Sequence, residues 1–392
     1  MDNGLESVRR AIDASVPEAL RIRRHIHQHP EISGKEENTS SLVAERLTAI
    51  GLDAVRTGVG GYGVVGTLRG TGGDGPVFAL RADMDALPIE EESDLPYRSS
   101  VPGVMHACGH DGHTATLLGT ADALCRLRSH IHGSVRFLFQ PAEEVADGAK
   151  GMCDDGAMSG VDAIAALHGW PGMVVGKIGI RSGPMMASAD TFDITLKGIG
   201  AHAAMPHLGV DPIVLASQIT LALQTISSRE ISPTEPVVVT ISQIHAGTAY
   251  NIIPGAAEMK GTVRCLRPEL RKDIPERIER IVAGLCAASR ASYKFHYRLG
   301  TPVTVNDSKI NELISNIGLE VLGEDGVIQL ESPSMGAEDF AVYLEYAPGA
   351  MFRLGVGEHT TPLHTPTYNF GDDPAPFGME MLTRIALRYL KT

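Results

Sequence analysis

Three short apolar runs, each followed by acidic or histidine residues, constrain the fold of this chain more than any other feature. The runs and the residues after them are 76–82 before Asp83 and Asp85, 134–140 before Glu143 and Glu144, and 161–167 before His168. Apolar runs of this length are typical of buried strands. Parallel strands joined by helices place their carboxyl ends at one sheet edge, where ligands bind in open α/β folds. The pattern therefore predicts an α/β unit with a polar site at that edge.

The periodicity changes after Met186. A strand, a helix, two strands, a helix and a strand are predicted over residues 191–197, 211–229, 236–244, 256–265, 270–290 and 292–299. This βαββαβ order is that of a ferredoxin-like α+β domain. We therefore expect a catalytic domain of residues 1–186 and 300–392, interrupted by an inserted domain of residues 187–299.

Composition narrows the class of partner. The 392 residues carry a formal net charge of −13, which argues against nucleic acid or an anionic membrane as a partner. Five cysteines are too few for a disulfide scaffold and favour a reducing compartment. No secretory signal and no apolar run near the roughly 18 residues of a membrane span is visible. We expect a cytoplasmic protein that acts on a small molecule.

The stretch MHACGHDGH, which begins at Met105, brings Cys108, His110 and His113 together in a glycine-broken loop before an apolar helix. Thiolate and imidazole ligands suit zinc and similar metals better than calcium or magnesium. Histidine-rich loops without a metal are common, so the loop alone leaves both readings open. Together with the strand-end residues, the donors exceed what one ion needs, and a pair of ions about 3.5–4 Å apart would use them.

Each of the other residues also has an ordinary structural reading. Glu143 and Glu144 could form a solvated helix start, and Asp83 and Asp85 could be turn residues. In a metal site, one glutamate could bind the metal while the other moves the proton of a bridging water. The joint occurrence of these residues after predicted strands favours the site.

Motifs in order along nearly the whole chain resemble the M20 metallopeptidase family, in its aminoacylase/amidohydrolase branch of hippurate hydrolases and auxin-conjugate hydrolases. They are RRHIHQHPE at Arg23, RADMDALPIEE at Arg81, MHACGHDGH at Met105, FQPAEE at Phe139, HGWP at His168, GAHAAMPH at Gly200, AYNIIPGAAEMKGTVR at Ala249, MGAEDF at Met335 and LHTPTYNF at Leu363. One departure is visible, because Asn369 stands where the pattern has an acidic residue.

The resemblance implies a di-metal phosphorylase/hydrolase-like catalytic domain with an inserted ferredoxin-like lid and dimerisation domain. It implies two divalent metal ions per subunit, zinc or manganese, with cobalt or nickel as alternatives. The residues that match the family's metal ligands are Cys108, His110, Glu144, His168 and His364. Glu143 matches the general base, and Asp85, favoured over Asp83, matches a carboxylate that orients a ligand.

Three further matches fall in the inserted domain. His202 resembles the histidine that reaches a neighbouring active site and stabilises the oxyanion. Asn251 and Arg264 resemble residues that bind the substrate's carboxylate. From the residues alone, His202 could equally be a surface loop histidine, Asn251 a turn residue and Arg264 a strand-end arginine.

The family implies metal-dependent hydrolysis of the amide bond of N-acyl amino acids, with N-acetyl, N-benzoyl or similar acyl groups, by a homodimer or higher homo-oligomer. Two alternatives remain at this point. One is a dipeptidase or a carboxypeptidase-like peptidase on the same di-metal scaffold. The other is a binding protein that keeps the fold without the chemistry.

Overall fold

A computed structural model describes residues 2–391 and divides them into two compact units. The second unit comprises residues 186–304 and 333–338, and the first unit comprises the rest of the described chain. The strands β7 (Gly183–Met186) and β14 (Thr304–Asn306) lie where the chain passes from one unit to the other. We had expected an insertion of residues 187–299, which all fall within residues 186–304 of the second unit. No sequence pattern pointed to the short segment 333–338.

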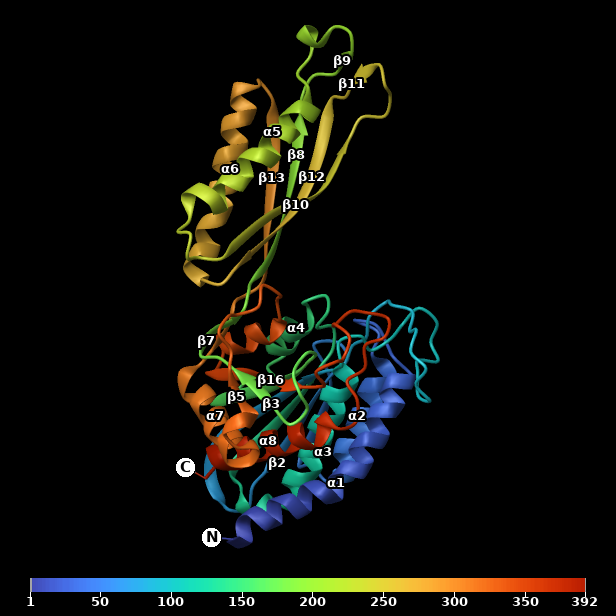
Figure 1. Cartoon of the computed structure of the whole chain (residues 1–392), viewed down its shortest axis with the longest axis vertical. Coiled ribbons are helices and arrows are strands. Elements are labelled where there is room, and N and C mark those ends of the chain that lie inside the picture. Colours follow the sequence, from blue (N-terminus) through green and yellow to red (C-terminus); the bar gives the residue numbers. More distant parts are fainter. Residues whose placement is uncertain (1, 392) are drawn as a thin grey trace. The chain divides into compact units, whose positions relative to one another are not determined.

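The first unit is built on an eight-stranded sheet (Figure 1). Its strands, in spatial order, are β1 (Ala54–Val59), β2 (Gly63–Arg69), β4 (His132–Gln140), β3 (Gly73–Asp83), β5 (Ala163–Trp170), β16 (Gly349–Gly355), β6 (Ile178–Ile180) and β15 (Val327–Gln329). The four central strands, β4, β3, β5 and β16, run parallel to one another. Their carboxyl ends therefore meet at one edge, as the three apolar runs predicted.

Helices cover both faces of this sheet. They are α1 (Asp2–Gln28), α2 (Glu37–Ile50), α3 (His110–Arg126), α4 (Gly148–Asp154), α7 (Ser308–Leu322) and α8 (Pro374–Tyr389), with short 3-10 helices at Arg128–His130, Glu324–Gly326 and Asp339–Glu345. One face packs against α1, α2, α3, α7 and α8, and the other against α4 and the 3-10 helix Asp339–Glu345. Both faces need helices because the apolar side chains of β5 alternate between them. Ala163, Ala165 and Leu167 belong to the hydrophobic cluster on one face, and Ile164 and Ala166 belong to the cluster on the other.

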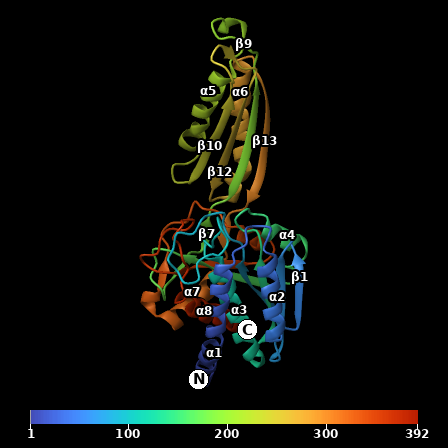
Figure 2. The same ribbon diagram turned by 90° about the vertical axis from the view of Figure 1, so that its right-hand side faces the viewer.

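The second unit has its own sheet (Figure 2). It also has its own hydrophobic core. Its main elements are β8 (Ala189–Lys197), α5 (Pro212–Thr225), β10 (Val237–Ala246), β12 (Ala256–Cys265), α6 (Pro268–Ala288) and β13 (Ser292–Thr301). Two small strands, β9 (Ala201–His202) and β11 (Ile252–Ile253), and the short helices Pro206–Leu208 and Ile226–Glu230 complete it. The antiparallel order β10-β12-β8-β13 is that of a ferredoxin-like sheet.

The predicted fold class, an α/β unit with a ferredoxin-like α+β insertion, is confirmed. One local expectation is wrong. His110 and His113 lie in the first turn of α3 rather than in a loop before it, because Gly109 adopts a left-handed conformation (φ 91°) that starts the helix early. None of the helices formed by residues 2–391 has the combination of length and apolar character that crossing a membrane requires.

Candidate functional site

The sheet edge brings together the side chains that follow the central strands. β3 ends at Asp83, β4 ends three residues before Glu143, and β5 carries His168 near its end. Helix α3 begins at His110 and adds its first turn to the same edge. Gly109 is required there, because a Cβ atom would lie 2.9 Å from the Tyr368 hydroxyl. The backbone therefore places residues from distant parts of the chain in one small volume.

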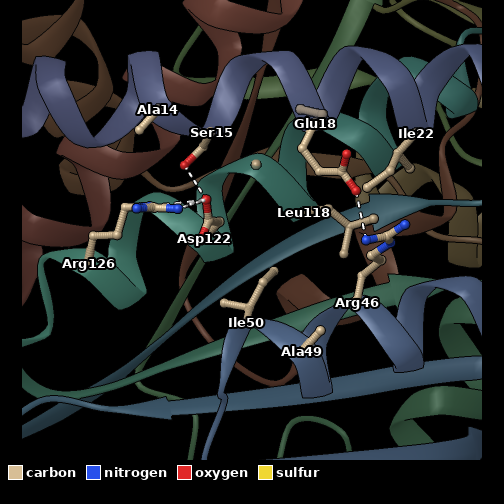
Figure 3. A pocket seen from close by; sticks show the side chains of 12 residues that line it. Ala14, Ser15, Glu18, Ile22, Arg46, Ala49, Ile50, Leu118, Asp122 and Arg126 are labelled. Carbon is tan, nitrogen blue, oxygen red and sulfur yellow. Dashed lines mark hydrogen bonds and ion pairs between the residues drawn. The ribbon is translucent and has the colours of Figure 1, made fainter.

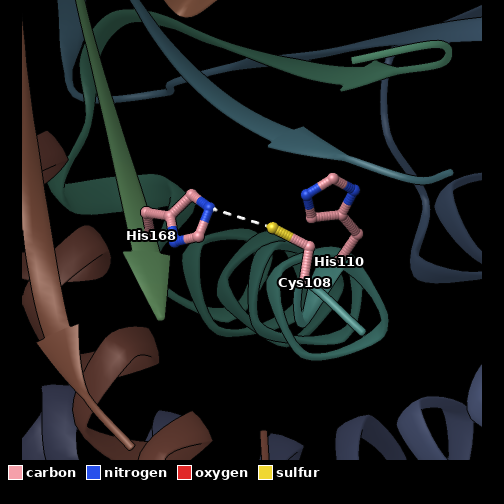
Figure 4. A group of neighbouring side chains, drawn as sticks. All are labelled: Cys108, His110 and His168. Atoms are coloured by element: carbon pink, nitrogen blue, oxygen red, sulfur yellow. Dashed lines mark hydrogen bonds between the residues drawn. The ribbon is translucent and has the colours of Figure 1, made fainter. Parts of the chain in front are cut away.

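Cys108, His110 and His168 form the first group of metal-ligating side chains (Figure 4). One ligand atom of each lies within 4.8 Å of the others, and all three residues are buried. The Cys108 Sγ atom is 3.5 Å from Nε2 of His168. A sulfur and two imidazole nitrogens at such distances form a donor set suited to a zinc-like ion.

Cys108 also belongs to a second group, with Glu144 and His364, within the same 4.8 Å limit. Nε2 of His364 is 3.4 Å from Oε1 of Glu144, and Nε2 of His110 is 3.9 Å from the same oxygen. The backbone N–H of His364 donates a hydrogen bond to the Ala107 carbonyl, which holds the residue in place. Its backbone has an unusual positive φ of 60°. Two groups that share a thiol are the arrangement expected for a pair of ions.

The imidazoles are oriented by oxygen atoms on their far side. Nδ1 of His110 lies 2.9 Å from the Asp85 carbonyl oxygen and 3.1 Å from the Asp85 carboxylate, and Nδ1 of His168 lies 2.8 Å from the Gly169 carbonyl oxygen. Each Nε2 is therefore left facing the group, as in metal-binding histidines. The other Asp85 carboxylate oxygen accepts hydrogen bonds from the Glu144 N–H and the Ser33 hydroxyl.

Two buried polar atoms within the described residues test whether a metal fits. Nε2 of His110 and Oε1 of Glu144 are buried and make no hydrogen bond in residues 2–391. Buried polar atoms are nearly always paired, so two such atoms facing one thiol indicate a ligand that completes them. The donor set therefore fits divalent metal ions.

The pKa shifts of Cys108 and His168 have different consequences for metal binding. Burial raises the pKa of the Cys108 thiol well above its ordinary value, and the nearby Glu144 raises it further. Burial lowers the pKa of His168 well below its ordinary value, which keeps that ring neutral. A neutral imidazole is ready to bind a metal, whereas the thiol requires the positive charge of an ion in order to lose its proton.

Asp83 and Asp85 have different surroundings. Asp83 is fully buried, forms a 2.7 Å ion pair with Arg81 and lies 2.6 Å from Nδ1 of His113. The pKa of Asp83 is lowered well below its ordinary value, because His110, His113 and Arg81 outweigh the effect of burial. Asp85 is the one that contacts both His110 and the Glu144 backbone. Arg81 is the first residue of the RADMD motif, but the motif did not indicate that its side chain forms an ion pair with Asp83.

The three predicted residues of the second unit lie outside these metal groups. His202 is exposed on β9, and its Nδ1 accepts a hydrogen bond from the Ala204 N–H. Asn251 precedes β11, the partner strand of β9, and its carbonyl accepts from the Ala203 N–H. Arg264 is half-buried on β12 and donates to the Thr262 hydroxyl. The structure thus places Asn251 next to the strand that pairs with the strand of His202, while Arg264 belongs to the four-stranded sheet.

A buried arginine that the motifs did not single out lies beside His168. Arg353 of β16 is level with His168 of β5 in the strand register, and its guanidinium stacks 3.6 Å above the Trp170 ring. Burial lowers the pKa of Arg353 to about 10.

A separate cavity of about 290 Å³ lies among α1, α2 and α3 (Figure 3). Ion pairs between Glu18 and Arg46 and between Asp122 and Arg126 line it, and the Ser15 hydroxyl donates to Asp122. None of the predicted site residues lines this cavity, so it is separate from the candidate metal site.

Comparison with known proteins agrees with this geometry. The sequence model of peptidase family M20/M25/M40 matches residues 79–388. The N-acetylcysteine deacetylase of Bacillus subtilis is 39% identical over 378 residues, which cover 95% of this chain and 97% of that protein. The N-acyl-L-amino acid amidohydrolase of Geobacillus stearothermophilus is 46% identical over 303 residues, 77% of this chain and 81% of that protein.

A solved structure is similar over nearly its whole length. The YXEP protein of Bacillus subtilis, described as a dinuclear metal binding peptidase of the M20 family, superimposes with a TM-score of 0.86 at 36% identity, covering 97% of this chain and 99% of that one. Coverage and identity of this order show common descent as well as a common fold. The chain therefore belongs to peptidase family M20/M25/M40 and is a hydrolase that acts on amide bonds.

Proposed function

We propose that this enzyme hydrolyses the amide bond of N-acyl amino acids and releases a carboxylic acid and a free amino acid. The observation that carries the proposal is the pair of donor groups sharing Cys108, with Glu143 and Glu144 beside His110 within 4.8 Å. The activities named for its relatives, removal of the acetyl group from N-acetylcysteine and hydrolysis of N-acyl-L-amino acids, support the choice of substrate.

Two divalent metal ions, zinc or manganese, would be held by Cys108, His110, Glu144, His168 and His364. Bound there, such ions polarise a carbonyl and make a water molecule acidic near neutral pH. Asp85 would keep the ligands in place, because it contacts both His110 and the peptide of Glu144. Removal of a residue that orients metal ligands typically lowers metal affinity or activity by about 10- to 100-fold.

Glu143 is the proposed general base. Its carboxylate would take a proton from the attacking water as the water oxygen bonds to the carbonyl carbon. It would then give that proton to the amide nitrogen as the carbon–nitrogen bond breaks, so that a neutral amine leaves. For the second unit we propose that His202 donates to the developing oxyanion of a neighbouring active site, and that Asn251 and Arg264 bind the substrate carboxylate.

Replacing Glu143 tests this assignment. The variant Glu143→Gln should retain its metal content and lose about 10²- to 10⁴-fold in kcat for N-acetyl-L-leucine, because only the proton transfer is removed. Glu37→Gln, which alters an exposed glutamate at the start of α2, serves as the control. Near-normal turnover by Glu143→Gln would remove Glu143 from the mechanism.

Metal analysis tests the ligand set independently. Cys108→Ser should lose metal along with activity, since the thiol belongs to both donor groups.

Dipeptides assayed beside N-acetyl amino acids would show whether peptidase activity predominates. Light scattering of the same preparation would test whether the enzyme is a homodimer or a higher homo-oligomer, as the family resemblance implies.

A further inference from the structure

Arg353 is a buried cation that has no anionic partner among residues 2–391. Only 9% of the residue is exposed, and its Nε atom is buried without a hydrogen bond. Within residues 2–391, its guanidinium makes no hydrogen bond or ion pair and instead lies over the face of the Trp170 ring, 3.6 Å from the ring centroid. Burying a charge is costly unless the charge is paired, so a missing partner at such a position calls for an explanation.

The arginine side chain extends toward the sheet edge that carries the metal groups. Arg353 is level with His168 in the register of β16 and β5, whereas Trp170 is level with Gly355, two residues further toward the carboxyl ends. Because the guanidinium lies over the Trp170 ring, the side chain reaches forward along the strands. The Trp170 ring is 5.8 Å from the His168 ring, so the cation lies close to a proposed metal ligand.

A comparison within the same unit separates this arginine from a structural one. Arg81 is also buried, and its guanidinium donates to Asp83, Gln140 and Asp339 at 2.7–3.0 Å. The fold thus supplies hydrogen-bond acceptors to an arginine that has a structural role in the core. Stacking on Trp170 fixes the position of Arg353 but leaves the hydrogen-bonding edge of its guanidinium unused.

We propose that Arg353 is a specificity-determining residue that binds a carboxylate of the substrate, with Trp170 holding its guanidinium in place. This inference rests on the proposed function. A guanidinium pairs with a carboxylate through two parallel hydrogen bonds, which gives both affinity and orientation. The carboxylate could be the α-carboxylate of the amino acid or a second one, on the amino acid side chain or on the acyl group.

Steady-state kinetics with four related compounds would test the proposal. They are N-acetyl-L-leucine, N-acetyl-L-glutamate, N-succinyl-L-leucine and the uncharged N-acetyl-L-leucinamide, the last measured as a competitive inhibitor where it is not hydrolysed. Arg353→Met keeps the length and apolar packing of the side chain but removes the charge. Arg353→Lys keeps the charge without the paired donors. Arg136→Met is the matched control, because Arg136 is a half-buried arginine of β4 whose hydrogen bonds, within residues 2–391, go to the carbonyls of Ala157 and Ser159.

Arg353→Met should raise KM about 10- to 100-fold for the compounds whose carboxylate it binds, with a smaller change in kcat, and should leave the binding of the leucinamide unchanged. A loss for all three acids identifies the α-carboxylate. A loss confined to N-acetyl-L-glutamate or to N-succinyl-L-leucine identifies the second carboxylate. Arg353→Lys should recover part of the loss, and Arg136→Met should show none.

Two outcomes would overturn the inference while leaving the proposed function intact. One is an unchanged KM for every acid in Arg353→Met. The other is an equal loss for the acids and the leucinamide, which would give Arg353 a structural role. If the unaltered enzyme hydrolyses none of the acids, the proposed function itself fails, so the two failures are distinguishable.

Discussion

At the scale of single residues, His27 shows how a side chain can be held in its charged form inside the protein. Its ring nitrogens lie 2.9 Å from the Asp111 carboxylate and 3.2 Å from that of Glu91, and all three residues are buried. Burial lowers the pKa of His27, but Asp111 and Glu91 outweigh it and raise the pKa to about 9. The protonated ring therefore links the end of α1 to the first turn of α3.

This ion pair predicts a pH-dependent contribution to stability. A pKa raised from 6.5 to about 9 stabilises the folded state fully below about pH 6.5, and this stabilisation is lost as the pH rises through about 9. The difference in unfolding free energy between the unaltered protein and His27→Gln should therefore shrink by an amount of the order of 3 kcal/mol between about pH 6 and about pH 9.5. Urea unfolding at both pH values measures it.

His296→Gln, which changes an exposed histidine of β13, is the control for this experiment. A stability difference that stays constant, or grows with pH, would contradict the ion-pair account. The sequence could not predict this contact. Asp111 and Glu91 are 84 and 64 residues away from His27, and no periodicity along α1 indicates which residues will face its last turn.

At the scale of elements, helix α3 positions the site through close packing. Gly112 lies two residues after His110, and a Cβ atom there would be 2.2 Å from the ring of Phe370. Phe370 is fully buried, so it has little room to move. The helix can therefore approach the final segment of the chain only because residue 112 has no side chain.

Gly112→Ala should lower stability by roughly 1–3 kcal/mol and reduce metal content, because the helix that begins at His110 must shift away from Phe370. Gly284→Ala is the matched control. Gly284 also lies within a helix, α6, but a Cβ atom there meets nothing within 4 Å. That variant should gain roughly 0.5–1 kcal/mol from helix propensity. Urea unfolding and metal analysis of both variants test the pair, and equal effects of the two substitutions would refute the packing argument.

The elements themselves were largely predictable. Runs such as 134–140 and 161–167 are typical of buried strands, and their order with the helices between them predicted the parallel sheet. The start of α3 was missed because apolar periodicity begins only after His113, whereas the helix starts at the left-handed Gly109. Helix α7 was missed as well, although Asp307 caps it by accepting hydrogen bonds from the N–H groups of Lys309 and Ile310.

At the scale of the whole molecule, each unit has a hydrophobic core of its own. Two clusters, built on both faces of the eight-stranded sheet, belong to the first unit, and a third, from Phe192 to Cys286, belongs to the second. The change in periodicity after Met186 had led us to expect an inserted domain of residues 187–299. All five proposed metal ligands fall in the first unit, with His364 contributed by the chain after the insertion.

Removal of the metals should therefore act on one unit. Ligands that bind only the folded state raise its stability, by about 2.7 kcal/mol at a free concentration of 100 Kd. A chelator should abolish activity and lower the melting temperature of the first unit, while the transition of the second unit stays in place. Differential scanning calorimetry, with Gly284→Ala to mark the transition of the second unit, would assign the two. If a single transition shifted as a whole on chelation, the units would be unfolding together, and the separate cores would not act as separate cooperative units.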